Sequence, residues 1–144
     1  MSSAYTLNVR VINDTRDPLT VIEKTAWFGA GTEWHDAEEG HVLSMNTSGS
    51  SGMLRLRNSR GDRFAVAVGI HNNKRWCDVT ADLDNATPLT KLHGRYYDDK
   101  DAKNKRLWAQ DEEFQVVTKG GATIKIVFYK VDGKMLWANL EYSS

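Results

Sequence analysis

Apolar and polar residues alternate along most of the chain, which is the pattern of β-strands that bury one face. The first such segment, 7–12, places Leu7, Val9 and Val11 on one face and largely polar residues on the other. Similar runs follow, separated by turn-forming residues such as those at 13–18 and 46–52. The predicted strands are 7–12, 21–28, 41–45, 53–57, 63–70, 114–118, 123–131 and 135–142, with a further short strand possible at 89–92.

Two local signals complete the predicted elements. Asp132-Gly133 lies between two β-branched and aromatic runs and is the strongest hairpin signal in the chain. Residues 98–110 have the composition of a helix, without glycine or proline. Many short strands, frequent turns and one helical insertion favour an antiparallel β-sandwich, and no internal repeat or linker divides the 144 residues.

Composition excludes several classes of partner. The 19 basic and 19 acidic side chains cancel, so the chain lacks the basic excess of a nucleic-acid-binding protein. No apolar run approaches the length of a membrane-spanning helix. Neither a signal peptide nor a second cysteine beside Cys77 is visible, so we expect a cytoplasmic protein without disulfides.

Catalytic and metal-binding patterns are also missing from the sequence. The four histidines and Cys77 show no ligand spacing, so no metal and no cofactor is expected. There is no G-x-S-x-G elbow, and Cys77 is flanked by Asp78, whose charge would disfavour a thiolate. Clustered acids lie in turns rather than in an opposed pair, so glycoside hydrolysis is not indicated and we expect a protein that is not an enzyme.

A polar stretch at the end of an apolar strand is the best candidate for a binding site. The run through Val68 and Ile70 breaks into His71 to Arg75, and Trp76, Cys77 and Asp78 follow. Amides suit vicinal sugar hydroxyls, small residues let the backbone approach a ligand, and aromatic faces stack on a pyranose. The candidate polar residues are Ser48, Gly49, Asn72 and Asn73, and the candidate aromatic platforms are Trp34, Trp76, Tyr96 and Tyr97. By itself this composition favours a sugar site only weakly over an ordinary loop.

Five stretches together resemble the fungal fruit-body lectins of the Agaricus bisporus type. Residues 64–78, FAVAVGIHNNKRWCD, are similar to the family's central IHNYKRWCD-type motif. Further similarity lies in VIEKTAW at 21–27, in HVLSM followed by SGSSGMLR within 41–55, in the tyrosine pair at 96–97 and in ANL at 138–140. The resemblance therefore runs through nearly the whole chain, and its central motif is long.

This resemblance implies one lectin domain over residues 1–144 with an actinoporin-like antiparallel β-sandwich, its two sheets joined by a helix-loop-helix. It also implies a homotetramer with a defensive role that binds glycans bearing Galβ1-3GalNAc or GalNAc. The first sugar site would comprise Ala30, Ser48, Gly49 and Asn72, with Asn73 at the position of a family tyrosine. The axial O4 hydroxyl of GalNAc would then contact the Ser48 hydroxyl, the Gly49 amide and Asn72.

A second family site, for terminal GlcNAc, corresponds less closely. Its positions fall on Asp78, Val79, Thr80, Ala81, Lys103 and Phe114. Lys103 replaces an arginine and cannot reproduce the planar, bidentate hydrogen-bond donor of a guanidinium group. Phe114 replaces a tyrosine and lacks the hydroxyl. The resemblance therefore predicts weakened or absent GlcNAc binding.

One alternative from the same fold is a pore-forming cytolysin of the actinoporin type, which would need an amphipathic N-terminal helix. The chain is expected to enter a strand by about Tyr5, which leaves no room for that helix, so membrane insertion is not expected.

Overall fold

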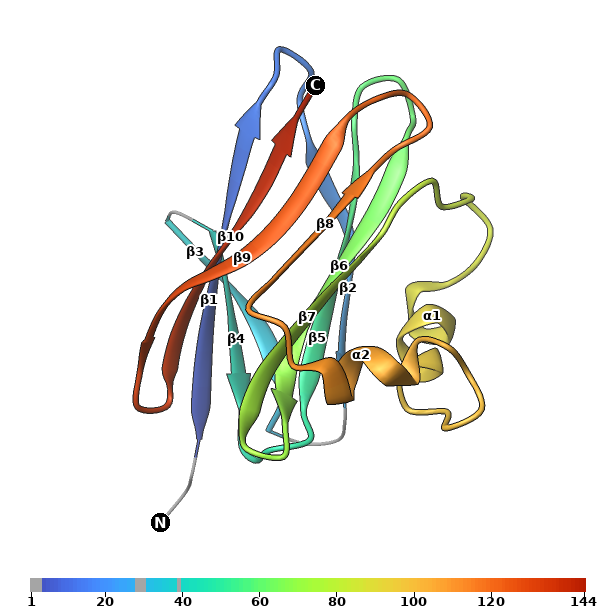
Figure 1. Cartoon of the computed structure of the whole chain (residues 1–144). Coiled ribbons are helices and arrows are strands. Elements are labelled where there is room, and N and C mark those ends of the chain that lie inside the picture. Colours follow the sequence, from blue (N-terminus) through green and yellow to red (C-terminus); the bar gives the residue numbers. More distant parts are fainter. Residues whose placement is uncertain (1–3, 28–30, 39) are drawn as a thin grey trace.

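Two β-sheets lie face to face, with two short helices beside one of them (Figure 1). This computed structural model describes residues 4–27, 31–38 and 40–144. The first strands are β1 (Tyr5–Asp14), β2 (Thr20–Trp27), β3 (Glu33–Ala37), β4 (Gly40–Met45) and β5 (Ser51–Arg57). The later elements are β6 (Arg63–His71), β7 (Lys74–Thr80), α1 (Leu89–Arg95), α2 (Asn104–Ala109), β8 (Glu113–Val117), β9 (Thr123–Asp132) and β10 (Met135–Ser143). The predicted β-sandwich is confirmed.

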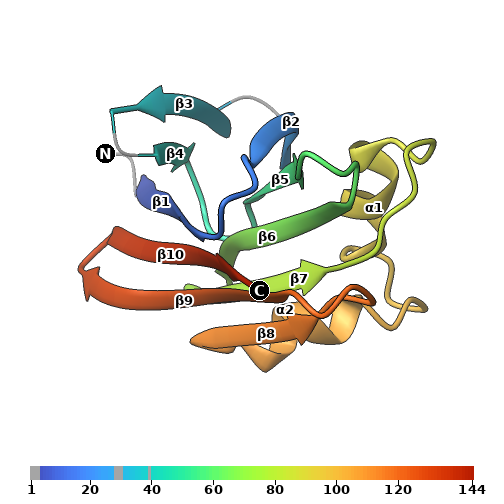
Figure 2. The same cartoon turned by 90° about the horizontal axis from the view of Figure 1, so that it is seen from above.

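The six-stranded sheet has the order β3-β4-β1-β10-β9-β8, and the four-stranded sheet has the order β2-β5-β6-β7. Seen from above in Figure 2, the two sheets form two layers. The alternating apolar residues of both layers meet between them and exclude water, which is the main stabilisation of such a fold. This core includes Leu7, Val9, Leu43, Leu54, Val66, Val68, Ile124, Ile126, Leu136 and Leu140.

One pair of strands departs from the predicted antiparallel arrangement. β1 and β10 run parallel in the middle of the six-stranded sheet, in register from Thr6 opposite Met135 to Asp14 opposite Ser143. Every other pairing between described strands is antiparallel. A parallel pair brings together segments distant in sequence, so no local turn signal could reveal it.

The helical connection between β7 and β8 covers the outer face of the four-stranded sheet. A second apolar cluster forms there, with Met53, Ala65, Ala67 and Trp76 from the sheet and Leu89, Leu92, Tyr96 and Leu107 from the connection. Both faces of this part of the sheet are therefore buried, which explains the nearly unbroken apolar sequence of β6.

Three sequence predictions need correction. Residues 89–92 begin helix α1 and are not a strand, because Leu89 and Leu92 lie three residues apart on the helix face that packs on the sheet. The predicted helix at 98–110 is helical only at Asn104–Ala109. Before it, Asp98 and Asp101 accept hydrogen bonds from backbone amides two residues ahead and shape turns instead. Strands β3 and β7 were not predicted at all. No helix in the described part of the chain is long and apolar enough to cross a membrane.

Candidate functional site

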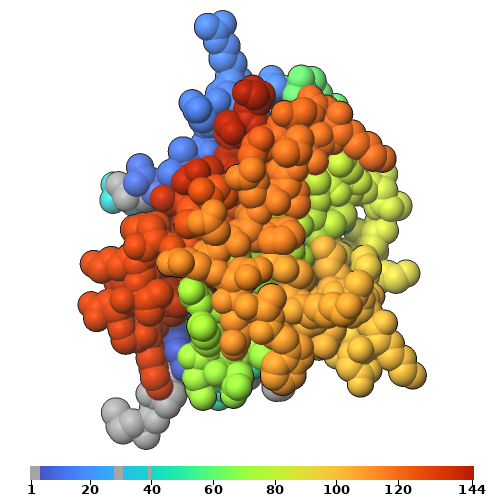
Figure 3. Space-filling view, viewed as in Figure 1, coloured from blue at the N-terminus to red at the C-terminus, as the bar shows by residue number. Residues whose placement is uncertain are grey.

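Two loops meet at one end of the sandwich and bring together most of the predicted first-site residues. Ser48 and Gly49 lie in the turn between β4 and β5, and Asn72 and Asn73 form the two-residue turn of the β6–β7 hairpin. Both asparagines have positive φ, 51° and 64°, as a type I′ turn requires and asparagine tolerates. Figure 3 shows the hairpin end in light green, between the red β9–β10 hairpin and the orange helical region.

Hydrogen bonds hold the two loops against each other. The Asn73 amide donates to Ser48 Oγ at 2.8 Å. The Gly49 amide donates to the Ile70 carbonyl at 2.8 Å, and the Ile70 amide donates to the Ser50 carbonyl at 3.0 Å. The relative position of the four residues is thus fixed by the backbone before any ligand arrives.

These bonds determine which groups remain for a ligand. Ser48 Oγ accepts from Asn73 and still has its own proton to donate. Asn73 Oδ1 accepts from the Tyr5 hydroxyl at 3.2 Å, which leaves its NH₂ group available. The exposed Asn72 side chain has no hydrogen-bond partner within the described residues. In this structure the Gly49 amide, which was expected to contact O4, donates to the Ile70 carbonyl.

Gly49 contributes shape instead. Its φ is +93°, a conformation that favours glycine, and an added Cβ would meet no atom within 4 Å. The space above this turn is therefore open. Ala30, the remaining residue predicted for the first site, lies outside the described residues.

A buried polar network supports the Gly49 turn from behind. Ser51 Oγ lies 2.6 Å from the Tyr97 hydroxyl and 2.8 Å from His93 Nε2, and His93 Nδ1 lies 2.7 Å from Thr25 Oγ1. The Tyr97 hydroxyl also donates to the Gly49 carbonyl at 3.4 Å. Burial lowers the pKa of His93 to about 4 and raises that of Tyr97 to about 12, so both groups are uncharged at neutral pH.

Of the four aromatic residues that the sequence indicated, Tyr97 lies beside the site, where its hydroxyl contacts the Gly49 carbonyl. Trp76 and Tyr96 are fully buried in the second cluster, so the prediction that they form sugar platforms is wrong. Trp34 is half-buried and donates through Nε1 to the Thr25 carbonyl at 2.9 Å. The half-buried Tyr97 instead stacks on Trp27, with ring centres 4.7 Å apart and planes 6° apart. Trp27 was missed because the sequence presents it only as the end of a strand.

The predicted second-site residues gather around Asp78, on the outer face of β7. The Asp78 carboxylate is 1% exposed. Its Oδ2 accepts from the Tyr96 hydroxyl at 2.5 Å and from Lys103 Nζ at 3.0 Å. Lys103 Nζ also donates to Thr80 Oγ1 at 2.7 Å. Burial, and then the charge of Asp78, raise the pKa of Tyr96 well above its ordinary value, so this phenol stays a donor.

Arg106 is a member of this group that the sequence did not reveal. Its Nε donates to Asp78 Oδ1 at 3.2 Å and one NH₂ group donates to Asp111 at 2.6 Å. Its guanidinium lies 4.0 Å from the ring centre of Phe114. The structure therefore unites Asp78, Thr80, Lys103 and Phe114. The Val79 and Ala81 side chains pack against the core between the sheets.

The chain is similar to known fungal lectins. The family described as fungal fruit body lectin matches residues 3–140. Boletus edulis lectin is 33% identical over 147 residues, covering 99% of this chain and 100% of that protein. The crystal structure of Xerocomus chrysenteron lectin has a TM-score of 0.91 and 33% identity, covering 97% of this chain and 99% of the other. The lipid-binding protein Nakanori has 13% identity and a TM-score of 0.57, and the match covers 97% of this chain and 71% of the Nakanori chain. That likeness shows the fold alone.

Proposed function

The chain belongs to the fungal fruit body lectin family, and from this membership we propose that it is a non-enzymatic lectin whose first site recognises Galβ1-3GalNAc and other GalNAc-bearing glycans. The observation that carries this proposal is the convergence of Ser48, Asn72 and Asn73 from two loops joined by hydrogen bonds. A hydroxyl and two side-chain amides, held rigidly beside an open turn, suit a ligand rich in hydroxyl groups.

Recognition of an axial hydroxyl follows from the groups still available. The Ser48 hydroxyl can donate to O4 of GalNAc, and the Asn72 amide can both donate to it and accept from it. A sugar with equatorial O4 would leave these groups without partners. Each lost hydrogen bond costs about 0.5–1.5 kcal/mol, so two losses weaken binding by about five- to 150-fold.

Asn73 gives this first site a character of its own. An amide stands where the family resemblance places a tyrosine, and its Oδ1 is held by Tyr5. The site therefore offers one more polar group and one less aromatic face. We expect fine specificity among Galβ1-3GalNAc glycans to differ accordingly.

The Asp78 group supports the further expectation that GlcNAc binding is weak or absent. Its carboxylate is enclosed and already accepts from Tyr96, Lys103 and Arg106. A sugar hydroxyl would have to replace one of these donors. Phe114 has no hydroxyl to compensate for that loss, and Arg106 lies over its ring.

The remaining expectations concern assembly and setting. A homotetramer would present several copies of the first site, and avidity would raise weak single-site affinity for clustered glycans. Light scattering on the protein as it elutes from a size-exclusion column tests the oligomeric state. The pore-forming alternative stays a prediction, and dye release from liposomes tests it. A cytoplasmic location and a defensive role stay predictions.

A glycan array of the wild type beside Asn72→Ala and Asn85→Ala tests the first site. Asn85 is an exposed asparagine in the loop before α1, so its variant controls for the loss of a surface amide. We expect strong signals on Galβ1-3GalNAc that Asn72→Ala abolishes and Asn85→Ala retains, with little signal on terminal GlcNAc. Folded wild-type protein without a Galβ1-3GalNAc signal, or an unaffected Asn72→Ala variant, would contradict the proposal.

A further inference from the structure

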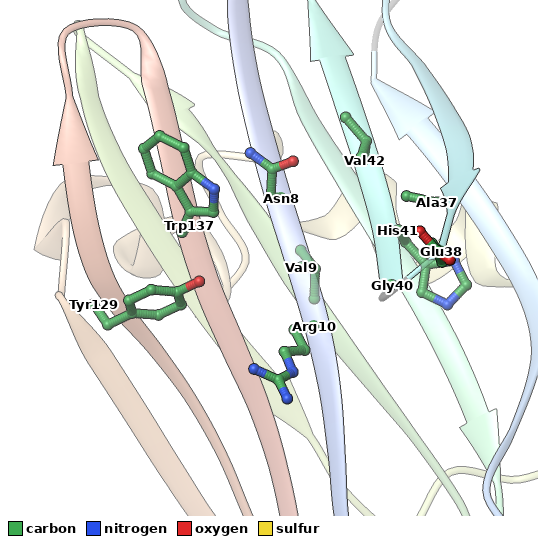
Figure 4. A pocket seen from close by; sticks show the side chains of 10 residues that line it. All are labelled: Asn8, Val9, Arg10, Ala37, Glu38, Gly40, His41, Val42, Tyr129 and Trp137. Carbon is green, nitrogen blue, oxygen red and sulfur yellow. The ribbon is translucent and has the colours of Figure 1, made fainter.

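A hollow of about 360 Å³ opens on the outer face of the six-stranded sheet, away from the Asn72 turn and the Asp78 group. Figure 4 shows its lining from close by. Trp137 and Tyr129 stand on one side, and Asn8 and Arg10 project from β1 in the middle. The opposite side is formed by β3, β4 and their connection.

The aromatic wall results from an irregularity in strand pairing. Between β9 and β10 the register shifts at Trp137/Ala138, so Trp137 lies opposite Lys130, Ala138 lies opposite Phe128, and Tyr129 is the extra residue. A β-bulge of this kind redirects side chains. Figure 4 shows the rings of Tyr129 and Trp137 together on the hollow's side of the sheet.

Part of the opposite wall is low because Ala37 and Gly40 are small and Gly40 lies close to β1. At Gly40 an added Cβ would lie 2.2 Å from the Val9 carbonyl oxygen, a contact that no side chain could make. Ala37 and Val42 are its neighbours in the lining. Glu38 and His41 complete this side, so it is polar where the opposite side is aromatic.

We propose that this hollow is a further carbohydrate-binding site that holds one uncharged pyranose ring. The aromatic faces of Tyr129 and Trp137 can pack against the apolar face of a sugar. Tyr129 is 54% exposed, whereas Trp137 is half-buried and held by Lys130, whose ammonium lies 4.7 Å from the ring centre. The proposal depends on the lectin function only for the class of ligand.

The polar groups of the hollow favour hydroxyl groups over an anion. Asn8 donates to the Leu136 carbonyl at 3.1 Å and keeps its own oxygen as an acceptor. Arg10 supplies donors from the middle and Glu38 supplies acceptors from the far wall, and neither has an ion-pair partner among the residues described. Hydroxyl groups donate and accept at once and can satisfy both, whereas a phosphate or carboxylate would face Glu38.

Glycan-array profiles of the wild type, Asn72→Ala, Trp137→Ala and Arg10→Gln test this assignment. We expect a set of neutral glycans whose signals survive Asn72→Ala and fall about tenfold or more in Trp137→Ala and Arg10→Gln. Trp108→Ala is the matched control, because Trp108 is an exposed tryptophan on α2 outside the hollow. Tyr129→Ala replaces Trp137→Ala if the latter does not fold.

Two outcomes would overturn the inference. The first is a glycan profile that Trp137→Ala, or its Tyr129→Ala substitute, and Arg10→Gln leave unchanged. The second is a change of oligomeric state in these variants, measured by sedimentation, because the hollow would then be an interface between copies of the chain. An Asn72→Ala variant that retains Galβ1-3GalNAc binding would refute the first-site proposal alone, since the hollow is judged by its own variants.

Discussion

His93 is predicted to make folding stability depend on pH in a range where few other side chains titrate. Its ring is 1% exposed, between Thr25 and Ser51. Burial penalises the imidazolium and lowers the pKa to about 4, against about 6.5 in an unfolded chain. The folded protein therefore holds this residue neutral at pH values where the unfolded chain would protonate it.

The sign and size of the effect follow from that difference. Between pH 6.5 and pH 4 the unfolded chain binds more protons at this position, so the free energy of unfolding rises with pH. The stabilisation is fully present above pH 6.5 and is lost as the pH falls toward 4. A difference of about 2.5 pKa units, at 1.36 kcal/mol each, makes the loss between pH 7 and pH 4 about 3 kcal/mol.

Urea unfolding from pH 7 to pH 4 measures this loss, with the wild type compared with His93→Gln. Glutamine keeps a donor and an acceptor near Ser51 but cannot gain a proton, so its curve should lack the slope due to His93. His35→Gln, at an exposed histidine, should keep the wild-type slope. Carboxylates with lowered pKa values, such as Asp36 and Asp101, are common to all three proteins and cancel in the difference. Parallel wild-type and His93→Gln curves would refute the reasoning.

Three further predictions concern packing and charge. Gly52→Ala should destabilise the fold by about 1–3 kcal/mol in urea unfolding, because its Cβ would lie 2.7 Å from the Trp34 ring. Gly120→Ala is the control, because its Cβ would meet only one atom, at 3.8 Å. Equal losses of stability in the two variants would contradict the prediction. Burial raises the pKa of the Cys77 thiol to about 12, so Ellman's reagent at pH 8 should react only after denaturation, and rapid labelling of the native protein would disprove this. Asp78→Asn should cost about 1–3 kcal/mol, because the buried carboxylate accepts from Tyr96 and from the partly exposed Lys103 and Arg106. An unchanged thermal unfolding midpoint would show that the ion cluster adds no stability.

The alternation of apolar residues predicted most strands, because each of them buries one face against the other sheet. It failed for β3, an edge strand whose residues are largely exposed, with only Trp34 half-buried. It also failed for β7, where Lys74, Arg75 and Asp78 interrupt the apolar pattern. It also failed at Leu89–Arg95, since a short apolar run looks the same in a helix and in a strand. Pairing between β1 and β10 depends on the whole topology and has no local signal.

The candidate sites were predictable to different extents. The sequence placed Asn72 and Asn73 at the end of an apolar strand. Only the fold shows that the turn containing Ser48 lies beside them and is hydrogen-bonded to Asn73. Arg106 was missed because helix α2 is shorter than predicted, which changes the residues that reach Asp78. The outer hollow gave no signal, because Trp137 looks like an ordinary strand residue and a β-bulge cannot be read from one sequence.

The parallel pairing of β1 with β10 has a consequence for the order of events during synthesis. β1 can pair with β4 as soon as residue 45 has left the ribosome, but its other edge must wait for Met135–Ser143. Until then the nascent chain carries an open strand edge in what becomes the middle of a sheet, and such edges are prone to pair with other chains. Contacts this distant in sequence also slow folding. We therefore expect crowded translation to favour aggregation of this protein before the sheet is complete.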